Sequence, residues 1–317
     1  MSIYQYMKEV LMNPIGGYYM KREAFGVKGD FITSPEISQM FGELIGVWFV
    51  NQWINLGKPK NVRIVEFGPG RGTLLDDMIR ALQNFHECYN SISGVHLIEA
   101  SPRLREIQRE KLKPYMINNT TTDTVNAKKQ VIRPGLNFYW HDAFEDRKPS
   151  LFILETLLKD YGGLYIPGDR IEIAPDAWRI ANQIAKSVNL NGGSCLIIDY
   201  GKNFAQGNTL RAIKQHRFVD LMSSPGEADL SADVNFKLLH NACKDLVDVF
   251  GPITQAHFLH SMGISLRLKM LLEQTPPSRH QDLILSYKRL TDSIGMGNVY
   301  QVLSITPKST TPPAGGF

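Results

Sequence analysis

An apolar run, a group of glycines and a helical repeat follow one another in the clearest pattern of this chain. Residues 61–67 form a short β-branched run that contains an acid, Glu66, near its end. A run of this kind bounded by Gly and Pro is typical of a strand. Apolar residues then recur at helical spacing from residue 74 to 82. We expect a strand, a glycine loop and a helix, with the loop at the carboxyl end of the strand, where open α/β sheets bind ligands.

Further apolar runs, several of them ending in an acid, predict the rest of an α/β sheet. The run before Asp199 is apolar throughout, as a central parallel strand should be. The expected strands cover residues 94–100, 136–144, 166–175, 194–201, part of 247–258 and 300–305. The expected helices cover residues 73–85, 102–112, 176–190 and 264–272.

The first 57 residues carry a helical pattern of their own. Ser34 suits an N-cap and Pro35 the first helical position, so one helix is expected from there to residue 56. We therefore expect an N-terminal helical extension over residues 1–57 and a core with insertions over 58–305. Residues 306–317 are predicted to be a disordered tail, because they are polar and rich in Pro and Gly.

Composition and charge argue against several classes of protein. The 35 Lys and Arg residues against 31 Asp and Glu leave a net charge of +4 over 317 residues, too weak a field to indicate nucleic-acid binding. The three cysteines lie far apart and the histidines form no ligand pair, so we expect neither a metal nor a disulfide. No apolar stretch is long enough for a membrane span. No presequence is visible, because a helical pattern begins at once.

The spacing of the glycines narrows the choice of ligand. Glu66 is followed by Gly68, Gly70 and Gly72, whereas a dinucleotide fingerprint would place its third glycine at position 73, which is Thr. This spacing disfavours a nicotinamide oxidoreductase and resembles motif I of the class I S-adenosylmethionine-dependent methyltransferases. An ordinary glycine-rich turn remains an alternative reading of the loop taken alone.

Two further acids stand at the ends of expected strands. Glu99 follows the second strand, where a carboxylate can accept both hydroxyls of a ribose. A helix-capping role is the alternative, although Ser101 would serve as the cap unaided. Asp142 ends the next strand, and in this fold that position commonly meets an adenine ring. An ordinary turn acid is the alternative for Asp142.

Several longer segments together resemble the MidA family, the mitochondrial complex I assembly methyltransferases and their bacterial relatives. The resemblance implies a Rossmann-like class I methyltransferase sheet, S-adenosylmethionine as the donor, and methylation of an arginine in a complex I core subunit in the mitochondrial matrix. The segments are Tyr6–Val10, Gly17–Tyr19, Gly29–Ser38, Phe41–Gly46, Glu66–Leu74, Asp199–Gly201, Pro225–Val234 and Met262–Ile264.

The chain departs from the family pattern after Asp142. Family members carry an Asn/His-Glu-Phe-Phe-Asp-x-Leu-Pro motif there, whereas here residues 144–150 run straight into residues 151–155. The loss would remove a central sheet strand and acids that flank the transferring methyl. A non-catalytic assembly or binding module is therefore the alternative function.

An arginine methyltransferase needs carboxylates that hold the acceptor guanidinium, which stays protonated above pH 12. Among the acids that remain, Glu36 and Asp30 are the candidates, followed by Asp199. Glu36 also has a simpler explanation, because an acid in the first turn of a helix is favoured by the helix dipole.

Overall fold

A computed structural model describes residues 1–21, 32–117, 135–143, 171–204, 207–308 and 312–317. Its helices are α1 (Ile3–Met12), α2 (Tyr18–Lys21), α3 (Ser34–Ile37), α4 (Gln39–Asn55), α5 (Thr73–Leu82), α6 (His86–Asn90), α7 (Pro102–Leu112), α9 (Pro175–Asn191), α10 (Phe236–Cys243), α11 (Gln255–Ser261), α12 (Ile264–Gln274) and α13 (His280–Thr291). Its strands are β1 (Val62–Phe67), β2 (Ile92–Ile98), β3 (Phe138–His141), β4 (Cys195–Lys202), β5 (Arg211–Lys214), β6 (Arg217–Val219), β7 (Asp229–Ser231), β8 (Val234–Asn235), β9 (Asp248–Thr254) and β10 (Tyr300–Thr306).

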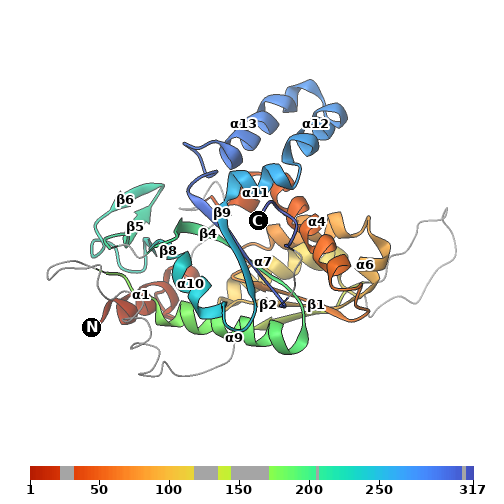
Figure 1. Ribbon diagram of the computed structural model, residues 1–317. Helices are drawn as coiled ribbons and strands as arrows, with labels where there is room; N and C mark the ends of the chain where they lie inside the picture. Colours follow the sequence, from red (N-terminus) through yellow and green to blue (C-terminus); the bar gives the residue numbers. More distant parts are fainter. Residues whose placement is uncertain (22–31, 118–134, 144–170, 205–206, 309–311) are drawn as a thin grey trace.

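The strands form two larger sheets and one small one (Figure 1). The first is parallel, in the order β1-β2-β3. The second has the order β8-β4-β10-β9, in which β10 runs antiparallel to both of its neighbours. The small sheet, in the order β6-β5-β7, is antiparallel and packs against α1 through a separate apolar cluster.

Two strand edges lack a partner in the part of the chain that the structure describes. Strand β1 pairs only with β2, and β4 pairs on one side with β10 but on the other only at its last two residues, with β8. Val65 and Phe67 of β1 are 47% and 40% exposed, although a strand inside a doubly wound sheet is normally buried on both faces.

Helix α4 packs against both of the larger sheets. Its buried residues contribute to two cores: Val50 and Trp53 face the β1–β3 sheet, while Leu44 and Trp48 pack against the C-terminal helices. A helix that is buried nearly all round carries apolar residues on every face. Figure 1 shows α4 beside α11, with α12 and α13 standing out above them.

Helix α4 approaches α5 closely because small residues line their crossing. A Cβ added at Gly42 would lie 2.5 Å from the Cβ of Asp77, and one at Gly46 would lie 3.1 Å from the carbonyl oxygen of Met78. Both positions therefore require glycine for reasons of space. The contact fixes the direction in which α5 leaves the glycine loop.

The structure corrects two expectations about the ends of elements. The helix predicted from Ser34 to residue 56 is interrupted at Ser38, whose extended backbone (φ −162°, ψ 141°) separates α3 from α4. Thr33 rather than Ser34 precedes α3, and the Ser34 hydroxyl is buried, donating to Oε1 of Gln255 (2.8 Å).

The second correction concerns the tail, which was expected to be disordered. Residues 312–317 are placed on α11, where the ring of Phe317 lies 6.0 Å from that of Phe258. The carbonyl of Gly316 lies 3.0 Å from Nε2 of His257. The expectation of disorder is wrong for these six residues, because the apolar ring of Phe317 packs on the protein although the segment as a whole is polar and rich in Pro and Gly.

Candidate functional site

The loop between β1 and α5 has a conformation that glycine adopts most easily. The φ angles of Gly68, Gly70 and Gly72 are 58°, 54° and 78°, all in the left-handed region. The amide of Gly68 donates to the carbonyl of Ile98 at the end of β2 (3.0 Å). A Cβ added at Gly68 would meet no atom within 4 Å. The loop therefore borders open space and leads directly into the N-terminus of α5, a favourable place for polar ligand groups.

Glu66 precedes this loop and has one carboxylate oxygen without a partner. Its Oε2 is buried and has no hydrogen bond with the described residues. Burial raises the pKa of Glu66 from 4.5 to about 8, because the charged form loses its hydration. A buried acceptor without a donor is rare in native proteins. A ligand that carries N–H or O–H groups would satisfy this oxygen.

Glu99 is joined to the glycine loop through Gln108 of α7. Its carboxylate is buried and accepts from the amide of Ser101 (2.8 Å) and from Nε2 of Gln108 (3.4 Å). The same nitrogen donates to the carbonyl of Gly70 (2.7 Å), and Oε1 of Gln108 accepts from Nε1 of Trp140 (2.9 Å). Burial raises the pKa of Glu99, while its hydrogen bonds lower it. One amide thus connects the loop after β1 to the acid after β2 and to β3.

Gln108 was not among the residues predicted from the sequence, although a signal for it was present. Leu104, Gln108 and Leu112 lie four residues apart along α7 and share its buried face. A glutamine in an otherwise apolar stripe must find hydrogen-bond partners there. The predicted cap of this helix is confirmed, because the Ser101 hydroxyl accepts from the amide of Leu104 (3.3 Å).

Arg105 contacts both Asp142 and Glu99, and it too was not among the residues predicted from the sequence. Nη2 of Arg105 is 2.5 Å from Oδ1 of Asp142, and Nε of Arg105 donates to the carbonyl of Glu99 (2.7 Å). The Asp142 side chain is 88% exposed, so most of its hydrogen-bonding capacity stays open to solvent or a ligand. The structure therefore brings the acids after β2 and β3 close together through Arg105.

Glu36 also lies beside the loop, but from the N-terminal side of the chain. Its Oε1 accepts from the hydroxyl of Thr73, the first residue of α5 (2.6 Å). It is therefore held next to Gly72 and not merely in a helix dipole. Asp30 lies outside the described residues.

Asp199 belongs to a separate cluster around the end of β4. Its Oδ1 accepts from the amide of Tyr200 (2.8 Å). The pKa of Asp199 is raised to about 6, chiefly because burial disfavours the charged form; the hydrogen bond from the Tyr200 amide lowers it, the neighbouring Asp233 raises it and Arg211 lowers it. A carboxylate with this pKa can exchange a proton near neutral pH.

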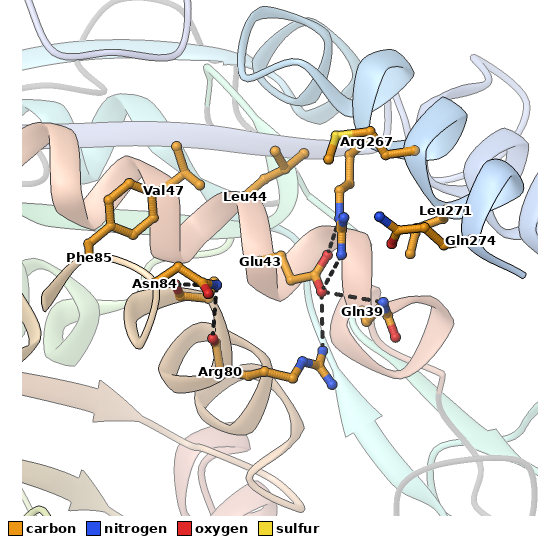
Figure 2. Close-up of a pocket in the computed structure, with 12 residues that line it drawn as sticks. Gln39, Glu43, Leu44, Val47, Arg80, Asn84, Phe85, Arg267, Leu271 and Gln274 are labelled. Atoms are coloured by element: carbon orange, nitrogen blue, oxygen red, sulfur yellow. Dashed lines mark hydrogen bonds and ion pairs between the residues drawn. The ribbon is translucent and has the colours of Figure 1, made fainter. Parts of the chain in front are cut away.

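A groove of about 580 Å³ lies between α4, α5 and α12, and none of the predicted site residues lines it (Figure 2). At its floor the buried carboxylate of Glu43 accepts from Nε and Nη2 of Arg267 (2.7 and 3.0 Å) and from Nη2 of Arg80 (3.4 Å). Figure 2 shows the two arginines reaching Glu43 from opposite sides. These contacts hold α12 against α4 and α5, so the network stabilises the packing of the three helices.

The described residues hold no group of three or more His, Cys, Asp or Glu side chains arranged to bind a metal ion. Within the same residues, no helix is long and apolar enough to cross a membrane.

Comparison with known proteins identifies the family. The chain matches the model of a family described as "Putative S-adenosyl-L-methionine-dependent methyltransferase" over residues 44–155 and 141–253. The chain belongs to this family. The predicted cofactor, S-adenosylmethionine, agrees with the family's description, and the loop, Glu66 and Glu99 described above fit a donor of that kind.

Named relatives within the family point the same way. The chain is 35% identical to "Protein arginine methyltransferase NDUFAF7, mitochondrial" of Xenopus tropicalis, with 100% of this chain and 85% of the relative covered. It is 34% identical to the human protein of that name, with 96% and 80% covered. A Burkholderia thailandensis protein described as a "likely methyl transferase", solved with S-adenosyl-homocysteine bound, shares the fold with a TM-score of 0.75 at 22% identity, covering 100% of this chain and 90% of that one. The predicted class I methyltransferase fold is confirmed.

The same comparisons bear on the predicted departure from the family pattern. The alignment with the Xenopus tropicalis relative runs over 367 positions while the chain has 317 residues, so at least 50 positions of the alignment have no residue here (367 − 317). The two matches to the family overlap at residues 141–155, directly at the end of β3. The segment predicted to be missing after Asp142 stays a prediction, because the alignment length alone does not say where those positions fall.

Proposed function

We propose that this chain is an S-adenosylmethionine-dependent protein-arginine N-methyltransferase. The observation that carries the proposal is the glycine loop, tied by Gln108 to the buried acid Glu99, in a chain of this methyltransferase family. The residues that would hold the donor are Glu66, Gly68, Gly70, Gly72, Glu99 and Asp142. When bound, the donor supplies a methyl group activated on a sulfonium.

The chain's own residues have to position the acceptor and remove a proton. A guanidinium is protonated at neutral pH and becomes a nucleophile only as a proton leaves. Carboxylates can hold it through charge-assisted hydrogen bonds of about 1.5–3 kcal/mol each. Glu36, whose carboxylate accepts from the Thr73 hydroxyl beside the loop, and Asp30 are proposed for this role. Asp199, with its pKa near 6, is proposed as the group that takes the proton.

The substrate is proposed to be an arginine of a respiratory complex I core subunit, and the location the mitochondrial matrix. The relatives are named mitochondrial arginine methyltransferases, and the resemblance to the complex I assembly family supplies the subunit class. The methylation would support assembly of that complex.

Calorimetric titration with S-adenosylmethionine tests the donor half of the proposal. We expect saturable binding by the unaltered chain and none by Gly70→Val, because φ of 54° disfavours a β-branched residue and its side chain would fill ligand space. Gly57→Ala, at a helix end with open space around it, is the control for a glycine with positive φ elsewhere. If the unaltered chain does not bind S-adenosylmethionine at high protein concentration, the proposal is refuted.

The second candidate is a non-catalytic assembly module, favoured by the divided sheet and the missing alignment positions. Incubation with methyl-deuterated donor and peptides of complex I core subunits, followed by mass spectrometry, separates the two. A methylated arginine excludes the module. Donor binding without any transfer supports it.

A further inference from the structure

One arginine of this chain is already held in the way that an acceptor arginine would have to be held. Arg211 opens β5, and its Nη1 donates to Oδ1 of Asp233 (2.7 Å) and to the carbonyl of Thr209 (3.2 Å). Its guanidinium carbon lies 4.9 Å from the centre of the Tyr200 ring. A planar guanidinium can stack its face on an aromatic ring while it donates at its edge to a carboxylate, a combination that a compact ammonium matches less well.

A second acid and a second ring complete this surrounding. The carboxylate of Asp199, one residue before Tyr200, interacts electrostatically with both Arg211 and Asp233. The ring of Tyr300 stands edge-on to that of Tyr200, with centres 5.7 Å apart. Arg211 keeps 29% of its side chain exposed, so part of this side chain is open to solvent.

A short chain of hydrogen bonds joins this cluster to the donor side of the molecule. Ser101, whose amide binds Glu99, donates its hydroxyl to the carbonyl of Tyr19 in α2 (2.8 Å). The hydroxyl of Tyr19 donates to Oδ1 of Asp229 (2.8 Å). Asp229 lies in β7, which pairs with the strand that Arg211 opens. The cluster is therefore linked through one helix to the acid proposed to hold the ribose.

We propose that Tyr200, Asp233 and Asp199 form the seat for the acceptor guanidinium, and that Arg211 fills this seat until a substrate arginine displaces it. The inference rests on the proposed arginine methyltransferase function and adds a substrate-binding site and a self-blocking contact to it. The incoming arginine exchanges with Arg211 on the same ring and carboxylates, and no covalent bond changes in this step.

The competing explanation is that the ion pair between Arg211 and Asp233 only stabilises the fold. The surroundings of Arg211 indicate that the small sheet does not need this ion pair. Strand β5 is held by backbone pairing with both β6 and β7. The preceding residues are fixed independently, because Glu172 accepts from the amides of Thr209 and Leu210 (2.8 and 2.9 Å). The small sheet should therefore keep its fold without the arginine.

Binding of Nα-acetyl-arginine amide tests the seat without any donor present. Calorimetry should show about tenfold tighter binding by Arg211→Ala than by the unaltered chain, because the internal competitor is gone. Nα-acetyl-lysine amide should show no such gain, and Arg211→Ala/Tyr200→Ala should lose it. Equal affinity of Arg211→Ala and the unaltered chain for the arginine probe overturns the proposal, as does an equal gain for the lysine probe.

The unaltered chain provides a second measurement if Arg211→Ala does not fold. The Nε–H resonance of Arg211 in an NMR spectrum should shift as the arginine probe is added and stay in place with the lysine probe. An unchanged resonance at saturating arginine probe overturns the seat. Because neither measurement involves methyl transfer, a failure here leaves the methyltransferase proposal to its own assay.

Discussion

Replacing Glu66 by Gln should remove a large pH dependence of folding stability. Burial raises the pKa of Glu66 from 4.5 to about 8 in the folded chain. Between these values the unfolded chain releases this proton while the folded chain keeps it, so the free energy of unfolding falls as the pH rises. At about 1.4 kcal/mol per pH unit, roughly 3 kcal/mol is lost by pH 7 and up to about 5 kcal/mol by pH 8. Glutamine has no proton to lose, so Glu66→Gln keeps this stability.

Urea unfolding followed by circular dichroism from pH 5 to pH 8 measures the effect. The two proteins should be nearly equally stable at pH 5, and Glu66→Gln should be the more stable by roughly 3 kcal/mol at pH 7. Glu87→Gln is the matched control, because Glu87 is an exposed acid whose side chain is 76% accessible. Parallel curves for the unaltered chain and Glu66→Gln across this range would refute the reasoning, since they would mean that Glu66 is solvated or paired.

Three further substitutions probe the network around the site. Glu43→Gln should lower the free energy of unfolding in urea by about 2–4 kcal/mol, because it leaves the half-buried guanidinium of Arg267 without its carboxylate. The exposed Glu87→Gln is the control and should change this free energy by less than about 1 kcal/mol. A loss for Glu43→Gln that is no larger than that of the control would contradict this prediction. Asp199→Asn should raise the free energy of unfolding by up to about 3 kcal/mol above pH 6, because the unaltered chain loses this stability as the pH rises from 3.8 to about 6 and asparagine does not ionise. The same variant should slow methyl transfer in the peptide assay, and faster transfer would exclude Asp199 as the proton acceptor. Gln108→Ala should weaken S-adenosylmethionine binding about tenfold in calorimetry, as supporting partners do elsewhere, and unchanged affinity would show that the amide only packs.

The parts of the fold that sequence could predict are those whose signals are local. The strand, glycine loop and helix over residues 62–82 follow from apolar periodicity and from positions that require left-handed backbone. Helix α7 begins and ends where its pattern does, because Ser101 and Pro102 define its start by their own chemistry. These elements carry the residues proposed to hold the donor.

The parts that could not be predicted depend on what a residue meets in three dimensions. The partners of Gln108 and Arg105 lie in the glycine loop, in β3 and just after β3, so helical spacing could not reveal them. The apolar run after Ser34 hides the single extended residue that separates α3 from α4. The small sheet β6-β5-β7 is built from strands of three or four residues in a polar segment, too short to show alternation.

Helix α4 has a consequence for how the whole protein denatures. Among the residues that the structure describes, the two larger sheets share no strand pairing, and two sheets of this kind would be expected to come apart in two steps, one sheet at a time. Here the same 17-residue helix supplies buried side chains to both cores, so losing either core exposes apolar surface that belongs to the other. The two halves are therefore thermodynamically coupled through a helix instead of through hydrogen bonds between strands, and they should melt together in a single cooperative transition.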